Sequence, residues 1–163
     1  MWWIPIGTLA FVLAWQEQAA AKQKGRNMAS VRQKNFSINT IIGSGSYIVG
    51  TIESPGFTRV DGNVLGDIKV QGQVVIGESA RMKSNVTGTS ITIGGVVFGD
   101  VLASEGVTIL ATGLVKGDII TRKIRADEGC FVHGRVKVCQ TQEAWDKAVS
   151  EYREIMAFTK NHG

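Results

Sequence analysis

The sequence predicts an all-β protein, a β-solenoid of about six coils that follows an apolar segment and precedes an amphipathic helix. Three observations support this fold class. A short motif recurs every 15 to 18 residues through the middle of the chain. The apolar residues of that region are mostly Val and Ile, which favour strands. The chain holds 20 Gly, a content unfavourable for a helix bundle. We expect residues 1–39 to be the apolar segment and a basic linker, 40–138 the solenoid, and 139–163 the helix and tail.

Residues 1–15 carry no charged side chain, and five basic residues follow them before residue 35. A helix of that length reaches about 22 Å, which is short of a hydrocarbon core of about 30 Å. Trp residues near both ends of the run are typical of a membrane interface, and the positive charge after it favours a cytoplasmic position for the rest of the chain. We therefore expect a membrane-targeting segment. Its residues would be Trp2, Trp3, Ile4, Leu9, Phe11, Val12, Leu13, Trp15, Lys22, Lys24 and Arg26.

Two other interpretations of this segment remain open. The run Ala19-Ala20-Ala21 has the small residues of a signal-peptide cleavage site, although no positive region precedes the apolar run. Alternatively, Met28 is the native start, and the segment is then not part of the protein.

The middle of the chain repeats the pattern G-x-V-x-G-D-[IV], which begins at Gly62, Gly95 and Gly113, with degenerate copies between and around these three. This period is too short for a propeller blade and fits one solenoid coil of about three short strands. Glycines at the corners permit a positive φ or close packing of the next coil. Because side chains alternate along a strand, one set should point inward. This set is Val64, Ile68, Val97, Val101, Val115 and Ile119.

Asp67, Asp100 and Asp118 occupy the same position of the repeat, and Asn85 stands there in another copy. We interpret them as a stacked column of corner residues, since Asp is a common turn former, and not as a catalytic pair of carboxylates. The sequence contains no G-x-x-x-x-G-K-[ST], G-x-S-x-G or H-E-x-x-H motif. His133 and His162 are interpreted as surface residues. We expect no catalytic, cofactor or metal site, and the alternative is a β-helical carbohydrate-active or acyl-transferring enzyme.

The basic charge of the chain lies in its N-terminal flank. Residues 1–39 have a net charge of +4, residues 40–138 of +1, and residues 139–163 of −1. A nucleic-acid-binding domain would carry its basic stripe on the folded body, so no nucleic-acid partner is expected. Cys130 and Cys139 are expected to be free thiols.

Thr141 to about Phe158 is predicted to be a helix, with Thr141 as its N-cap and Glu143 in its first turn. We expect this helix to dock on the solenoid body or over its last coil, because terminal coils need covering. A partner-docking helix or a weak coiled-coil contact is the alternative. Its apolar face would consist of Trp145, Ala148, Val149, Tyr152, Ile155 and Met156.

Together these features resemble a bactofilin, a member of the bacterial polymer-forming cytoskeletal family. The resemblance covers about residues 38–138. It begins with NTIIGSG at 39–45, continues through the three complete motifs and ends with GCFVHGRV at 129–136. It implies a right-handed, three-sided parallel β-helix that polymerises end to end without nucleotide. It also implies membrane-apposed filaments that scaffold cell-wall enzymes and affect cell shape. The N-terminal segment here is longer and more apolar than is usual in the family.

A solenoid ends in open strand edges and an apolar cross-section, and identical molecules can stack there into filaments. We expect Phe131, Val132 and Val136 of the last coil to form this polymerisation interface. In the rival interpretation, Phe131 points into the solenoid under the C-terminal helix. The expected partners are further copies of the chain, the cytoplasmic face of the inner membrane and peptidoglycan-modifying enzymes. An exported adhesin-like solenoid is another alternative, which requires the signal-peptide interpretation.

Overall fold

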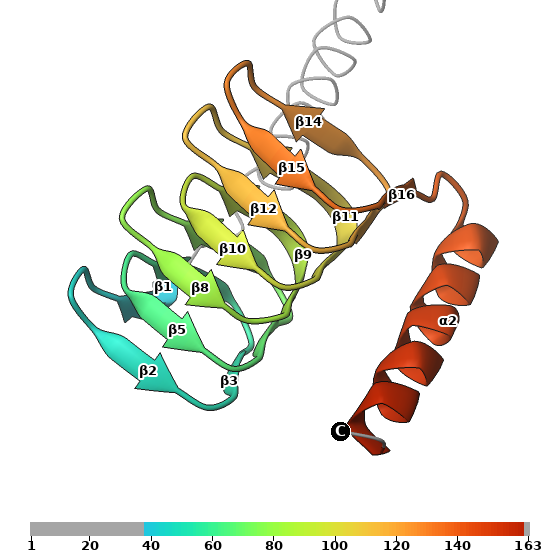
Figure 1. Cartoon of the computed structure of the whole chain (residues 1–163), viewed down its shortest axis with the longest axis horizontal. Coiled ribbons are helices and arrows are strands. Elements are labelled where there is room, and N and C mark those ends of the chain that lie inside the picture. The colour runs from blue at the N-terminus through green and yellow to red at the C-terminus, as the bar shows by residue number, and fades with distance from the viewer. Residues whose placement is uncertain (1–37, 162–163) are drawn as a thin grey trace, which may run out of the picture. The chain divides into compact units, whose positions relative to one another are not determined.

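The computed structural model of the protein describes residues 38–161. These residues form a solenoid of six coils followed by one helix, α2 (Figure 1). Each coil contributes one short strand segment to each of three faces, and all strand pairs between coils are parallel. At the usual strand spacing, six coils make a solenoid about 29 Å long. The predicted fold class and number of coils are therefore confirmed.

The three faces are defined by their strands. The first face consists of β1 (Ile38–Ile42), β4 (Phe57–Val60), β7 (Gln73–Ile76), the second halves of β9 (Val86–Ile93) and β11 (Val101–Ile109), and β14 (Ile124–Ala126). The second face consists of β2 (Tyr47–Val49), β5 (Asn63–Leu65), β8 (Arg81–Lys83), β10 (Val96–Phe98), β12 (Leu114–Lys116) and β15 (Phe131–His133). The third face consists of β3 (Ile52–Ser54), β6 (Ile68–Val70), the first halves of β9 and β11, β13 (Ile119–Thr121) and β16 (Val136–Val138).

The core of the solenoid is a set of aliphatic columns that run through the coils. In one column Val64, Met82, Val97 and Val115 lie above one another in register, and none is more than 2 % exposed. All six residues predicted to point inward are buried, so this prediction is confirmed. Burying a Val or Ile side chain contributes about 1.5–3 kcal/mol, so these columns are a major source of stability.

The second glycine of the motif is required by both its backbone angle and its surroundings. Gly117 has a φ of +153°, and a Cβ placed on it would collide with the carbonyl group of Gly99 in the coil below. Gly99 has a φ of +148° and meets the Ser84 carbonyl in the same way. The corner therefore needs Gly for the left-handed conformation and for the close approach of stacked coils.

Helix α2 (Gln142–Asn161) begins directly after the solenoid. Its N-cap is Thr141, as predicted, because the Ala144 amide donates to Thr141 Oγ1 at 3.2 Å. The helix packs on the outer side of the third face, where Ala148 joins Leu102, Ile120 and Cys139 in a small buried cluster. Predicted docking on the solenoid body is thus confirmed, whereas Ile155, assigned to the apolar face, is largely exposed.

Candidate functional site

The last coil exposes positions that are fully buried in the coil before it. On the third face, Val136 pairs in register with Ile119 and is 43 % exposed, whereas Ile119 is 0 % exposed. Val138 pairs with Thr121 and is 44 % exposed, whereas Thr121 is again 0 % exposed. Both valines belong to inward columns and are exposed because no further coil lies on them. The solenoid therefore ends in an apolar cross-section.

The other inward positions of this coil are also apolar. They are Ile124 and Ala126 on the first face, Cys130 at the corner, and Val132 on the second face. Among the described strands, β14, β15 and β16 each pair only with the coil before them, so each leaves one strand edge open. We call the inward residues of the last coil, from Ile124 to Val138, the terminal surface. It combines apolar area with unpaired backbone groups, as an interface to another strand layer requires.

Of the three predicted interface residues, two lie on the terminal surface and the third lies on the outer side of the solenoid. Val132 and Val136 lie on the terminal surface, packed against or continuing the core columns. Phe131 pairs with Leu114 on the outer side of the second face and is 57 % exposed. Its ring stacks on His133, with ring planes 2° apart and centroids 6.5 Å apart. The rival interpretation, with Phe131 inside the solenoid and covered by the helix, is therefore wrong, because the alternation along β15 sends Val132 inward and its neighbours outward.

Sequence reasoning missed Val138, Ile124 and Ala126 as members of the terminal surface. The signal was present, because Val138 lies two residues after Val136 and so shares its side of the strand. The motif, however, ends at the position of Val136, and the strand beyond it varies from copy to copy.

The predicted column of corner residues is confirmed and forms a continuous ladder between the second and third faces. Asn85 Nδ2 donates to Asp67 Oδ1 at 3.2 Å. The Asp100 amide donates to Asn85 Oδ1 at 3.0 Å, and the Asp118 amide to Asp100 Oδ1 at 2.9 Å. Each polar side chain thus satisfies a group of the adjacent coil. Asn85 also separates Asp67 from Asp100, which reduces repulsion between the carboxylates.

The ladder ends at Arg135 in the last coil. The Arg135 guanidinium lies 2.6 Å from Asp118 Oδ2, and the Arg135 amide donates to Asp118 Oδ1 at 3.2 Å. The guanidinium hydrogen bond holds the pKa of Asp118 below its usual range. Every member of the column thus has a structural partner, and the arrangement works as a corner brace between coils.

Helix α2 lies beside the solenoid and does not cover the terminal surface. It packs on the third face beside the last coils, where Ala148 contacts Leu102, Ile120 and Cys139 (Figure 1). Burial, followed by the negative charge of Asp100, raises the pKa of Tyr152. The helix is thus fixed to the side and leaves the end of the solenoid accessible.

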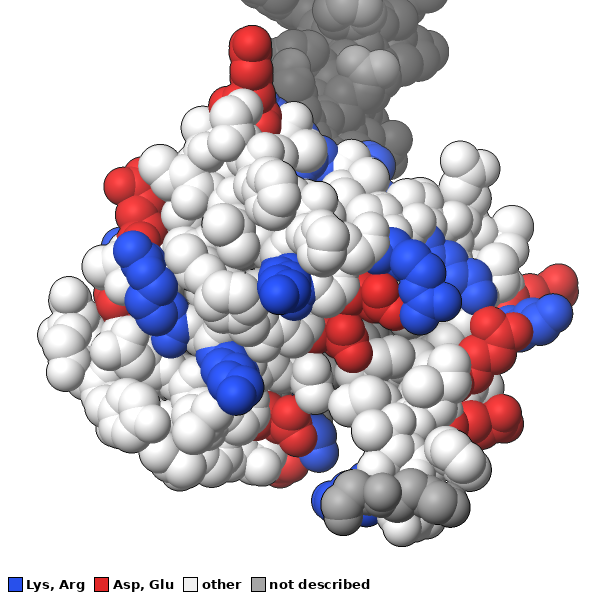
Figure 2. Space-filling model, viewed as in Figure 1, with Lys and Arg blue, Asp and Glu red and all other residues white. Residues whose placement is uncertain are grey.

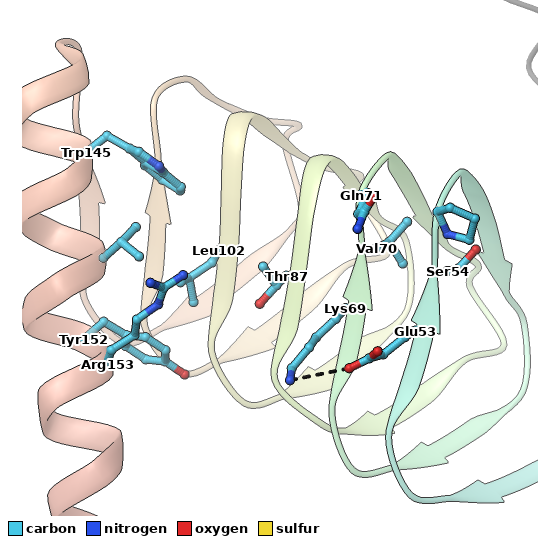
Figure 3. A pocket seen from close by; sticks show the side chains of 12 residues that line it. Glu53, Ser54, Lys69, Val70, Gln71, Thr87, Leu102, Trp145, Tyr152 and Arg153 are labelled. Atoms are coloured by element: carbon cyan, nitrogen blue, oxygen red, sulfur yellow. Dashed lines mark ion pairs between the residues drawn. The ribbon is translucent and has the colours of Figure 1, made fainter.

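A groove of about 790 Å³ lies between α2 and the third face. Figure 3 shows Trp145 and Tyr152 projecting from the helix toward Leu102, with the ion pair of Lys69 and Glu53 farther along the coils. The Lys69 nitrogen and the Glu53 oxygen are 3.7 Å apart. Within residues 38–161 the structure contains no group of three or more His, Cys, Asp or Glu side chains placed to hold a metal ion.

Several other predictions concern the two cysteines, the histidines and the membrane. Cys130 is half-buried and Cys139 is buried, and both are free thiols, as expected. His133 is exposed, as predicted, whereas His162 lies outside the described residues. In the described part of the chain, no helix is long and apolar enough to cross a bilayer. The predicted membrane-targeting residues, from Trp2 to Arg26, lie outside the described residues.

Comparison with known proteins gives a consistent set of matches. The family model described as "Bactofilin: Polymer-forming cytoskeletal" matches residues 40–137. Bactofilin BacP of Myxococcus xanthus (strain DK1622) is 29 % identical over 112 residues, which are 67 % of this chain and 47 % of BacP. Bactofilin BacO of the same organism is 28 % identical over 105 residues, 64 % of this chain and 83 % of BacO. The chain thus spans about half the length of BacP.

A solved structure is also similar to the solenoid. It is a cryo-EM reconstruction of Thermus thermophilus bactofilin double helical filaments, with a TM-score of 0.58 and 25 % sequence identity. The match covers 61 % of this chain and 99 % of that chain.

Proposed function

The chain belongs to the bactofilin family of polymer-forming cytoskeletal proteins, and on this premise we propose that its solenoids associate end to end into filaments. The terminal surface carries this proposal. Val136 and Val138 are more than 40 % exposed, whereas the corresponding residues of the preceding coil, Ile119 and Thr121, are fully buried. Contact with another copy removes this apolar area from water and gives the open strand edges partners. When the last coil of one copy meets the first coil of the next, the contact does not close on itself and therefore builds a filament.

Val136→Arg tests the proposal. Because Val136 is the last residue of its inward column, the substitution leaves the columns of the preceding coils in place and puts a charge in the contact between copies, where an unpaired charge is strongly unfavourable. We expect electron microscopy to show no filaments and circular dichroism to show an unchanged β signal.

Phe98→Arg, on the second face in the fourth coil, introduces the same side chain away from the terminal surface and should leave filaments intact. Normal filaments of a correctly folded Val136→Arg protein would refute the end-to-end contact.

We further propose that the filaments lie on the cytoplasmic face of the membrane and act as a structural scaffold for cell-wall enzymes, without catalysis of their own. The apolar run 1–15 and the basic residues after it support membrane association. Removing residues 2–15 should lower the fraction of the protein that is bound to the membrane and leave the solenoid folded. An unchanged membrane fraction would contradict the N-terminal route.

The scaffolding role is tested in cells. Peptidoglycan-modifying enzymes should colocalise with the filaments in the wild type and disperse in cells that carry Val136→Arg, and cell shape should change with them. An unaltered enzyme distribution after filament loss would exclude the scaffold.

A further inference from the structure

The second face of the solenoid presents two outward columns of side chains. One column runs from Tyr47 through Arg81 to Phe131, and the other from Val49 through Phe98 to His133. This face points toward the viewer in Figure 1, and no helix lies over it there. Helix α2 packs instead on the third face. The second face is thus a sheet surface that the described residues leave uncovered.

The charges on this face all have the same sign. Its six strands contain Arg81, Lys83 and Lys116 and no acidic residue. Figure 2, in the same view, shows an uncharged surface with separate Lys and Arg side chains on it and acidic side chains along its margins. Among the described residues, none of these three bases forms an ion pair. The basic residues that do form ion pairs lie elsewhere, in the pairs Arg59–Asp61, Lys69–Glu53, Arg125–Asp127, Arg135–Asp118 and Lys137–Glu151.

Large apolar side chains lie between these basic residues. Tyr47 is 68 % exposed and Phe98 is 47 % exposed, and Phe98 stands in register between Lys83 and Lys116. A shallow hollow lined in part by Tyr47, Leu65, Lys83 and Phe98 joins the two columns. Aromatic rings and basic side chains without ion-pair partners thus share one surface.

We propose that the second face binds the surface of an anionic lipid bilayer. Basic side chains attract the charged headgroups, and apolar rings beside them enter the boundary between headgroups and acyl chains. A second copy of the chain fits this face less well, because pairing the face with itself would bring basic side chains next to basic side chains. This inference deepens the membrane association proposed above and assigns it a second contact on the folded body, separate from residues 1–15.

End-to-end assembly would strengthen this contact. One face is only six strands long, about 29 Å, so a single molecule binds through few side chains. A filament repeats the same face along its length, and each bound copy raises the effective concentration of the next copy at the bilayer.

The test uses the full chain with Leu9, Phe11, Val12 and Leu13 replaced by Ser, which weakens the N-terminal route and keeps every residue of the solenoid. We expect this protein to sediment with vesicles of phosphatidylcholine and phosphatidylserine, not with phosphatidylcholine alone, and to be released by salt. Adding Lys83→Glu with Lys116→Glu should weaken binding by roughly 30-fold or more, because each basic residue contributes about fivefold at an anionic surface. Phe98→Ala should weaken it as well.

Matched control variants show whether vesicle binding depends on the second face or only on the net charge of the protein. Lys123→Glu with Lys147→Glu changes the net charge equally at exposed positions off the second face and should leave binding unchanged. Ile41→Ala removes an exposed apolar side chain of the first face and should also have no effect. Circular dichroism verifies that each variant is folded.

Three results would overturn the inference. The first is a serine-substituted protein that does not bind anionic vesicles, which would leave the N-terminal route as the membrane contact. The second is an equal loss of binding in the two charge-reversal variants. The third is unchanged vesicle binding of the Lys83 and Lys116 variant together with disrupted filaments in the absence of lipid, since this face would then join copies of the chain. Electron microscopy of the same samples distinguishes these outcomes from a failure of the filament proposal.

Discussion

Arg135 closes the column of corner residues by binding Asp118 twice, through its backbone amide at 3.2 Å and its guanidinium at 2.6 Å. The Asp118 carboxylate, one coil below, accepts both bonds, and the Asp118 backbone amide donates to Asp100 Oδ1. The last coil, which is covered on one side only, is thus attached to the solenoid by a charge-assisted contact as well as by its strands.

Asp118→Asn should lower the free energy of unfolding at neutral pH. It should also make that free energy less dependent on pH in the acidic range. The pKa of Asp118 is held below its usual value of 3.8 by the hydrogen bond from Arg135. A lowered pKa means that the stabilisation is complete above pH 3.8 and is lost as the pH falls through the value in the folded protein. We expect a difference of less than about 1 kcal/mol at pH 7, because solvent screens the partly exposed pair. Urea unfolding of both proteins should show the difference disappearing toward low pH, and a constant difference would contradict the assignment.

Gly117→Ala should destabilise the solenoid much more than Gly43→Ala. A Cβ at position 117 is strained by the positive φ and collides with the backbone of Gly99, so a cost of about 2–4 kcal/mol is expected. No described atom lies within 4 Å of a Cβ at position 43, and the expected change there is within about 0.5 kcal/mol. Thermal unfolding measures both. Equal effects would mean that stacking at the corner does not require Gly.

Phe131→Arg is expected to abolish filaments while the β signal persists. The ring lies at the rim of the terminal surface and is mostly exposed, so its replacement does not open the core. Phe98→Arg makes the same change on the same face two coils earlier and should leave filaments intact. Sedimentation and circular dichroism provide the measurements. Intact filaments with intact β signal would remove Phe131 from the interface.

Filament mass should not depend on nucleotide or divalent metal. The sequence has no phosphate-binding loop motif, and the described residues contain no cluster of metal ligands. Pelleting assays with ATP, GTP or a chelator should yield the same amount of polymer as buffer alone. If filaments required a nucleotide or a divalent metal ion, contact through the terminal surface would not be sufficient for assembly, and the prediction would be wrong.

The sequence by itself determined the features that repeat. The strand alternation placed Val64 and Val115 inside, and the motif spacing aligned Asp100 with Asp118, because each copy carries the same local signal for strand and corner. The N-cap at Thr141 was equally local. The same alternation also implied an outward Phe131, since Val132 aligns with the inward Val115.

The tertiary structure decided what depends on the neighbours of a coil. Val136 occupies the same repeat position as Ile119, and its exposure differs because the solenoid ends above it. Helix α2 had apolar residues along one side in the sequence, but its position on Leu102 and Ile120 depends on which outer residues happen to stack there. The basic and aromatic second face likewise exists only after stacking, because residues about seventeen apart in the chain become neighbours when each coil pairs with the next.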